Sequence, residues 1–370
     1  MAAGRRDGQE TLTASFASAL LERSVLDAAA RLHSKPIYQM VREKQLGLDL
    51  AAVHPALDGI DFAGLLPARP RTRFHIRHTV GPADALTPAD IRRGDSVGDG
   101  LPETLAENID RYELRFFKVK ISGDIEADLQ RLQDVWDVLP KAPETTVTLD
   151  ANEAYQDIRA FEQFVRLLRG RAPGLFDHIA YIEQPLLRGL TMDESTGAAV
   201  KRISAEKLLL IDEADGTVDA YRRAHAIGYA GTSHKNCKGF FKSLLNRALV
   251  ERFRGDGDPA FLSGEDLQNL PIVPLHQDFV SVSILGLTDC ERNGHHLNFG
   301  LSMLSEVDKA SIARNHSDLY EQRGDEWFLK IRGGMVDTSS LHCPGFGVID
   351  EPDFDSMEPM DAWIERRFPA

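Results

Sequence analysis

The spacing of apolar positions changes along the chain. Over the first 45 residues it is helical: residues 14–32 carry apolar side chains at three- and four-residue intervals, and residues 36–44 continue after a break at Pro36. From about residue 70, short apolar segments are followed by amphipathic ones. The predicted strands are 72–80, 116–122, 145–152, 178–185, 207–215, 230–238, 259–267 and 279–289. Predicted helices lie between them at 125–139, 158–170 and 240–253. This alternation indicates parallel βαβ units, and eight strands favour a closed barrel.

Composition narrows the class of protein. The chain has 370 residues, 42% hydrophobic and 27% charged, with a formal net charge of −14. The net negative charge argues against a nucleic-acid partner, because nucleic acids are themselves negatively charged. A membrane partner is not expected either, because no apolar run approaches the ~20 residues of a membrane span. The start of the chain lacks the apolar core of a secretory signal, and three cysteines without a CxxC pair favour a reducing compartment. We therefore expect a cytoplasmic protein.

Acidic residues end three successive predicted strands. Asp150, Glu183 and Asp212 are each about one βα unit apart. In a parallel barrel, the carboxyl ends of the strands meet at one rim. Mutual repulsion of three carboxylates there requires a cation, and an all-oxygen site suits Mg²⁺, with Mn²⁺ as the alternative.

Lysines occupy two other predicted strands. Lys118 and Lys120 share one face of the second strand, and Lys235 lies on the sixth, across the ring with the carboxylates between. Lysine is a poor base at its ordinary pKa of ~10.4, but burial and a neighbouring ammonium would lower the pKa of Lys120 toward about 7–8. The alternative is a set of helix caps and solvated lysines, with Lys235 and Lys238 in an exposed loop. The joint order of lysines and carboxylates favours a catalytic site.

These motifs together resemble one family. "FKVKIS", "TLDANEAY", "YIEQPL", "LLIDEADG", "GTSHKNCKG", "FLSGEDL" and "GGMVDTSSLHCPGFGV" are similar to the enolase superfamily, in particular the mandelate racemase and muconate lactonizing enzyme group, over about residues 15–350. The resemblance implies an α/β fold: a TIM-like (β/α)7β barrel with a small N-terminal α+β capping domain. It also implies a homo-oligomer and a small carboxylate substrate.

The resemblance assigns roles residue by residue. Asp150, Glu183 and Asp212 correspond to the Mg²⁺ ligands, Lys120 to the general base with Lys118 beside it, and Lys235 to the lysine on the opposite face of the substrate. Asn152 and Glu213 correspond to groups that hold the ligands. Glu265 or Asp266, at the end of the seventh strand, would contact substrate or act as an acid, and the sequence leaves open which of the two faces inward.

Opposed lysines match the muconate-lactonizing pattern, whereas a His–Asp pair replaces the second lysine in mandelate racemase. We interpret His295 and His296 as loop histidines and His234 as structural. The implied reaction is removal of the proton next to a carboxylate, through an enediolate, by an isomerase: a racemase, epimerase or cycloisomerase. The alternatives are a lyase of the same superfamily similar to acid-sugar dehydratases, a non-catalytic barrel, and a Schiff-base aldolase that uses Lys120 or Lys235.

The sequence also predicts a division of the chain. Residues 1–70 are expected to be a mostly helical remnant of the capping domain, residues 71–325 the barrel with the active site, and residues 326–370 a segment that returns to the cap. Because the helices start near residue 15, we expect the three-stranded meander typical of this cap to be missing. That meander belongs to the lid that excludes water and selects the substrate.

Overall fold

In the computed structural model, residues 10–92, 94–267, 269–292 and 300–368 are described. Eight parallel strands form a closed ring, since β1 pairs with both β2 and β8. The strands of the ring are β1 (Arg73–Val80), β2 (Phe116–Lys120), β3 (Thr146–Asp150), β4 (Ile179–Glu183), β5 (Leu208–Ile211), β6 (Gly231–His234), β7 (Phe261–Gly264) and β8 (Asp289–Arg292). The predicted α/β TIM-barrel fold is confirmed. A further strand, β11 (Met335–Asp337), pairs antiparallel with the first residues of β1 and lies outside the ring.

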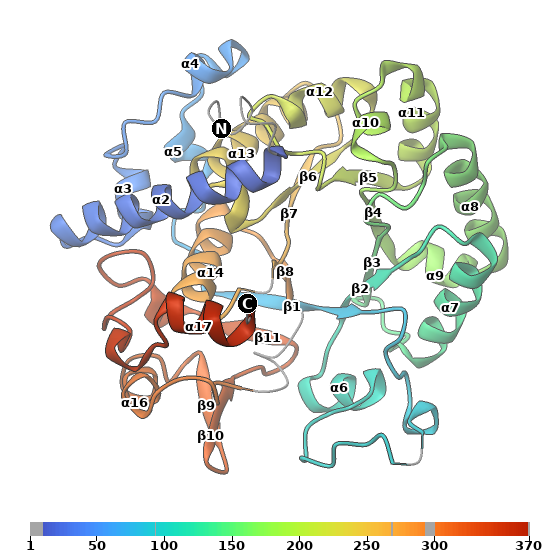
Figure 1. Cartoon of the computed structure of the whole chain (residues 1–370). Coiled ribbons are helices and arrows are strands. Elements are labelled where there is room, and N and C mark those ends of the chain that lie inside the picture. The colour runs from blue at the N-terminus through green and yellow to red at the C-terminus, as the bar shows by residue number, and fades with distance from the viewer. Residues whose placement is uncertain (1–9, 93, 268, 293–299, 369–370) are drawn as a thin grey trace.

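Helices between the strands surround the ring (Figure 1). They are α6 (Leu105–Tyr112), α7 (Ile125–Val138), α8 (Ile158–Arg171), α9 (Pro173–His178), α10 (Arg188–Thr191), α11 (Gly197–Glu206), α12 (Ala220–Ile227), α13 (Phe240–Gly255) and α14 (Val273–Leu285). Their apolar faces turn to the strands. In α8, for example, Phe161, Phe164, Val165 and Leu168 recur at helical spacing and are buried. Asp157 caps the first turn of α8 by accepting a hydrogen bond from the backbone N–H of Arg159.

The eighth predicted strand, at residues 279–289, is wrong. Residues 273–285 form α14, and the eighth strand begins only at Asp289. Every residue of α14 from Leu275 to Leu285 is buried. A helix covered on all sides has no exposed face, so its sequence shows no 3.6-residue period and resembles a buried strand. Gly286, with a φ of 73°, ends the helix.

The described residues ahead of β1 form helices and no strand. They are α2 (Thr11–Leu32), α3 (Ile37–Arg42), α4 (Leu50–Val53) and α5 (Phe62–Leu65). α2 lies against the 3₁₀ turn Asn236–Lys238 that follows β6, where Arg23 Nη1 donates to the carbonyl of Asn236 at 2.7 Å. The N-terminal helix therefore sits beside the carboxyl end of β6.

The chain after β8 runs back along the barrel. It contains α16 (Glu306–Asn315), a hairpin of β9 (Tyr320–Arg323) and β10 (Glu326–Leu329), then β11 and α17 (Met360–Arg367). Gly345 forms a bridge with Pro36, so the C-terminal segment reaches the N-terminal helices. Within the described ranges, we found no helix with the length and apolar character needed to cross a membrane.

Candidate active site

Strand register brings the predicted site residues to one level of the ring. Lys120 lies opposite Asp150 in the β2–β3 pair, and Asp150 lies opposite Glu183 in the β3–β4 pair. Asp212 follows β5, and Lys235 follows β6. All five residues are thus at the carboxyl ends of their strands, the end where barrel enzymes carry their chemistry.

Lys118 is the centre of the charged cluster. Its Nζ lies 2.8 Å from Glu183 Oε2, 2.8 Å from Glu265 Oε2, 2.9 Å from Asp150 Oδ2 and 3.1 Å from Glu291 Oε2. Burial alone would lower the pKa of Lys118, but the four carboxylates outweigh burial and raise it well above the ordinary value. Lys118 is therefore a permanently charged counter-ion inside the barrel.

Lys120 faces the same oxygen of Asp150 from the more open side. Its Nζ donates to Asp150 Oδ2 at 2.6 Å and to Asn152 Oδ1 at 2.8 Å, and its side chain is 25% exposed. Asn152 Nδ2 in turn donates to Glu213 Oε1 at 2.9 Å. Burial, together with the charge of Asp212, raises the pKa of Glu213. Asn152 thereby links Lys120 to Glu213 through two hydrogen bonds.

Asp212 holds two lysines on the opposite side of the ring. Its Oδ2 lies 2.6 Å from Lys235 Nζ, and its Oδ1 lies 2.8 Å from Lys238 Nζ. Ser233 Oγ also donates to Asp212 Oδ1. Burial lowers the pKa of Lys235, but Asp212 outweighs it and raises that pKa well above the ordinary value. Lys235 therefore carries a proton.

Lys238 is not in an exposed loop, which was the alternative that the sequence left open for it. Its side chain is buried, and its Nζ donates to the carbonyl of Asp212 at 2.7 Å and to Ser233 Oγ at 2.6 Å. A lysine beside a glycine after a strand is usually in solvent, so the sequence contained no signal for this burial. His234, predicted as structural, is buried, and its Nδ1 lies 2.7 Å from Ser243 Oγ. The two histidines predicted to lie in a loop, His295 and His296, are outside the described residues.

The structure shows which residue after β7 faces the barrel axis. Glu265 contacts Lys118 and Arg77 and accepts a hydrogen bond from the Tyr181 hydroxyl at 3.0 Å. Asp266 turns the other way, toward Arg292 Nη1 at 3.3 Å. Burial raises the pKa of Asp266 to about 6, against the lowering effect of Arg292. Glu265 is therefore part of the Lys118 cluster, and Asp266 belongs to a separate ion pair.

Two members of the cluster were not anticipated. Glu291, in β8, contacts Lys118, and its Oε1 accepts from Thr79 Oγ1 at 2.8 Å. Arg77, in β1, contacts Glu265 and Asp289. Glu291 was missed because the eighth strand was placed ten residues too early. The correct strand, with its sequence "DCER", would have drawn attention to it.

The carboxylates have the chemistry of a divalent-metal site. Neither oxygen of Glu183 accepts a hydrogen bond, although Oε2 is in ionic contact with Lys118. Burial, Asp150 and Glu265 raise the pKa of Glu183 well above its ordinary value, against the lowering effect of Lys118. In the described part of the chain, no group of three or more acidic, histidine or cysteine side chains is placed so that it could hold a metal ion as it stands. A bound metal ion would thus have to replace contacts that Asp150 and Asp212 now make with lysines.

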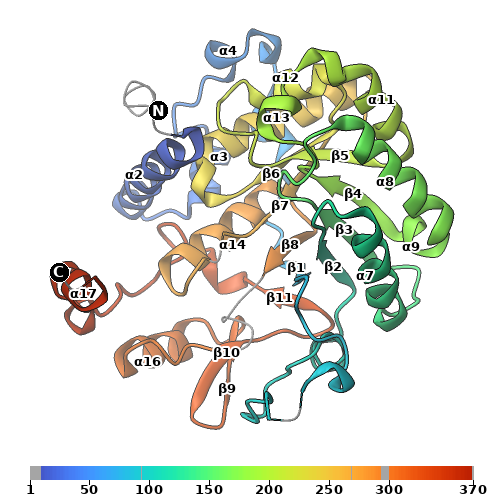
Figure 2. The ribbon, with the colours of Figure 1, turned by 45° about the vertical axis from the view of Figure 1, so that its right-hand side comes forward.

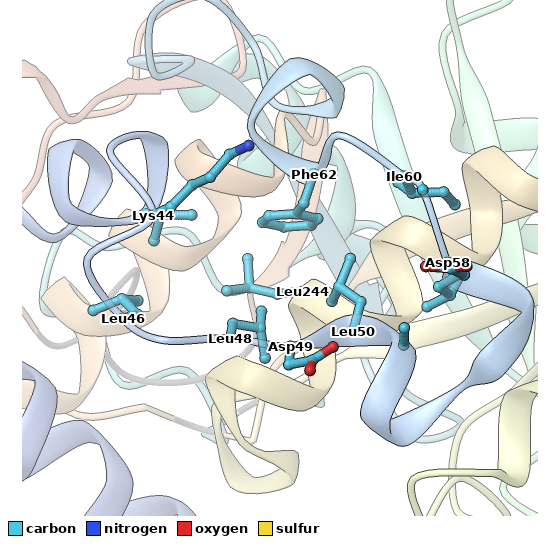
Figure 3. Close-up of a pocket in the computed structure, with 13 residues that line it drawn as sticks. Lys44, Leu46, Leu48, Asp49, Leu50, Asp58, Ile60, Phe62 and Leu244 are labelled. Atoms are coloured by element: carbon cyan, nitrogen blue, oxygen red, sulfur yellow. The ribbon is translucent and has the colours of Figure 1, made fainter.

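A cavity of about 330 Å³, lined by apolar side chains and by Lys44, Asp49 and Asp58, lies elsewhere in the molecule (Figure 3). Leu46, Leu48, Leu50, Ile60 and Phe62 of the N-terminal segment line it together with Leu244 of α13. None of its lining residues belongs to the lysine–carboxylate cluster. This cavity is therefore separate from the candidate active site at the barrel mouth.

The geometry defines an eight-stranded parallel barrel with a buried ionic cluster at its carboxyl end, and known structures share this fold. A 3,6-anhydro-D-galactonate cycloisomerase from Zobellia galactanivorans matches with a TM-score of 0.57 and 13% identity, over 92% of this chain and 74% of that one. The muconate lactonizing enzyme from Pseudomonas putida matches with a TM-score of 0.54 and 16% identity, over 89% and 71%. A dipeptide epimerase from Enterococcus faecalis V583 matches with a TM-score of 0.52 and 12% identity, over 89% and 73%.

No protein-family model matches the chain, and no curated protein matches it in sequence. At 12–16% identity, the three structural matches establish the fold. The chain therefore shares its barrel with a cycloisomerase, a lactonizing enzyme and an epimerase.

Proposed function

We propose that this chain is a divalent-metal-dependent isomerase of the enolase superfamily, which removes the proton next to the carboxylate of a small organic acid. The observation that carries the proposal is the position of Lys120 and Lys235. They follow β2 and β6, on opposite sides of the ring, and both contact carboxylates of the strand-end set. A substrate bound between them would have an amine on either face.

The names of the structural matches support this reaction class. Two are a cycloisomerase and a lactonizing enzyme, a third is an epimerase, and another match with the same fold was solved in complex with magnesium. The fold alone does not carry a function. The proposal therefore depends on the lysines and carboxylates of this chain, and the matches agree with it.

The residues of the chain divide the work as follows. Asp150, Glu183 and Asp212 would hold the metal ion, which supplies stabilisation of negative charge on the substrate oxygens. Lys120, the more exposed lysine, accepts the proton from carbon. Lys235, on the opposite side of the ring, delivers a proton to the other face of that carbon. An elimination would share the first step but needs an acid at the leaving group, so two opposed lysines favour isomerisation over the lyase alternative.

Solvent exchange tests the proposal. The protein is incubated with Mg²⁺ and a panel of small carboxylic acids in D₂O, and deuterium at the carbon next to the carboxylate is measured by NMR. We expect exchange that requires Mg²⁺ and falls by about 10²–10⁴-fold in Lys120→Met. The exposed Lys201→Met serves as the matched control and should exchange at the wild-type rate. Exchange that persists in a Lys120→Met/Lys235→Met double variant, or in excess EDTA, would contradict the assignment.

A further inference from the structure

Lys238 is enclosed in the turn that follows β6. It ends the 3₁₀ turn Asn236–Lys238, and its side chain is only 2% exposed. Its ammonium donates to Asp212 twice, to the backbone carbonyl at 2.7 Å and to Oδ1 at 2.8 Å, and also to Ser233 Oγ at 2.6 Å. Asp215 Oδ2 lies 3.8 Å from the same ammonium. Lys238 is therefore a buried cation paired with two buried carboxylates.

The backbone on both sides of Lys238 is fixed by α2, which lies beside α13 (Figure 2). Before it, the carbonyl of Asn236 accepts from Arg23 Nη1 at 2.7 Å. After it, the backbone N–H of Phe241 donates to Glu22 Oε1 at 2.9 Å. Both side chains come from α2, so this helix holds the turn at two points. The ammonium of Lys238 is thus kept on Asp212 by its own contacts and by the turn that carries it.

The other lysine of Asp212 is held differently. Lys235 Nζ lies 2.6 Å from Asp212 Oδ2, and its side chain is 12% exposed. The two oxygens of this carboxylate therefore have separate partners: Oδ1 has Lys238 and Ser233, whereas Oδ2 has Lys235. Because Lys235 is the more exposed of the two lysines, Oδ2 is the oxygen that can exchange its lysine for a metal ion. Oδ1 would keep Lys238.

We propose that Lys238 is a built-in cation of the candidate metal site, which stays on Asp212 when a divalent ion binds and lowers the affinity of the site for that ion. The inference rests on the proposed function, because it takes Asp212 as a metal ligand. The ion and the ammonium would share one carboxylate, so their charges repel each other. Even at the dielectric constant of water, repulsion between charges that close together reduces affinity about tenfold or more. Occupancy of the site would then follow the concentration of free Mg²⁺.

Titration calorimetry of the metal-free protein with MgCl₂ tests the proposal. Lys238→Met removes the charge and keeps the length of the side chain, and we expect it to bind Mg²⁺ at least about tenfold more tightly than wild type. Lys238→Gln, which keeps a hydrogen-bond donor beside Asp212, should also bind more tightly, and circular dichroism checks that both variants fold. The direction of the change is decisive, because loss of a merely structural contact would misplace Asp212 and weaken binding.

Lys242→Met is the matched control. Lys242 is a buried lysine of α13 whose Nζ lies 2.8 Å from Asp215 Oδ1, so this variant loses a buried charge that pairs with Asp215 and not with Asp212. Its affinity for Mg²⁺ should stay close to that of wild type. If wild type binds Mg²⁺ and the Lys238 variants bind it equally or more weakly, or if Lys242→Met tightens binding as much as they do, the role of Lys238 is overturned and the metal site stands. Absence of Mg²⁺ binding in wild type and in every variant would overturn the metal site itself, and the role of Lys238 with it.

Discussion

Lys118 sets the electrostatic balance inside the barrel. Barrel interiors are ordinarily filled by layers of branched apolar side chains, whereas here the Lys118 ammonium is surrounded by carboxylates from β3 and β4, from the residue after β7 and from β8. Charges taken out of water are tolerated only when they are paired, and loss of one partner leaves the others uncompensated. Lys118 therefore holds the ring together as well as flanking the site.

Replacing Lys118 with Met should reveal this role. We expect a loss of about 3–5 kcal/mol in the free energy of unfolding at pH 7, because buried carboxylates lose their shared cation. Lys120→Met, which changes a more exposed side chain of the same strand, should cost much less. Urea unfolding of both variants measures the difference. Equal losses in the two variants would show that the four carboxylates do not depend on Lys118.

At the scale of the element, the turn between α14 and β8 determines which residues enter the site. α14 ends at Gly286, in the left-handed region, and β8 starts three residues later. β8 then directs Glu291 to Lys118 and Arg292 to Asp278 of α14. A helix that ended one turn later would shift this strand. The glycine therefore fixes the register of the last strand and the position of Glu291.

A pair of glycine substitutions tests this turn. In Gly286→Ala the new Cβ would lie 2.7 Å from Pro67 Cγ at a φ of 73°. We expect a destabilisation of at least about 1–2 kcal/mol, since a side chain is disfavoured in the left-handed region. Gly170→Ala, inside α8 with no atom within 4 Å of its Cβ, should instead stabilise by about 0.5–1 kcal/mol. Thermal unfolding of both variants compares them, and a neutral Gly286→Ala would contradict the account.

At the scale of the whole molecule, the C-terminal segment holds the N-terminal helices to the barrel. Gly345 bridges to Pro36, and Asp27 of α2 accepts from Phe346. His276 of α14 contacts the same segment: its Nδ1 lies 2.8 Å from the carbonyl of Gly347, and its Nε2 lies 2.9 Å from the Tyr320 hydroxyl. These contacts suit a neutral imidazole that donates from Nδ1 and accepts at Nε2.

The stability of this arrangement should fall in acid. Burial, together with neighbouring His316, lowers the pKa of His276 to about 3. The unfolded chain takes up this proton near pH 6.5, so the contribution of His276 is complete above pH 6.5. Below pH 6.5, this contribution to the free energy of unfolding decreases by about 1.4 kcal/mol per pH unit as the pH falls toward 3. Urea unfolding at pH 7.5 and pH 5 measures the change.

His276→Gln isolates the contribution of this histidine. The variant should be less stable than wild type at pH 7.5 but lose less stability between pH 7.5 and pH 5. His33→Gln, at an exposed position after α2, is the control and should keep the wild-type dependence. If His276→Gln has the same pH dependence as wild type, His276 is not a source of the acid sensitivity.

The positions of strands, and of the side chains at their ends, could be predicted from the sequence where they depend on the local spacing of apolar and polar residues. The first seven strands were located correctly because each is a short apolar segment that is followed by a helix. Their ends were not: β5 and β6 end four residues, and β7 three residues, before the predicted ends, and Lys235 lies after β6. The shared face of Lys118 and Lys120, and the level of Asp150 and Glu183 in the ring, follow from the two-residue period of strands and the regular βα spacing. The catalytic roles assigned to these residues stay predictions.

Three features were decided by the tertiary structure alone. α14 was misread because burial on every side removes the helical period, and Glu291 was missed with it. Whether Glu265 or Asp266 faces the axis depends on where β7 ends within the ring. Lys238 is buried because Asp212 and Ser233, close in space but separate in sequence, surround its ammonium. The sequence by itself thus determined the barrel and the side chains at its rim, since both follow from local periodicity. Only tertiary structure decided which charges meet, because those contacts depend on how the ring closes.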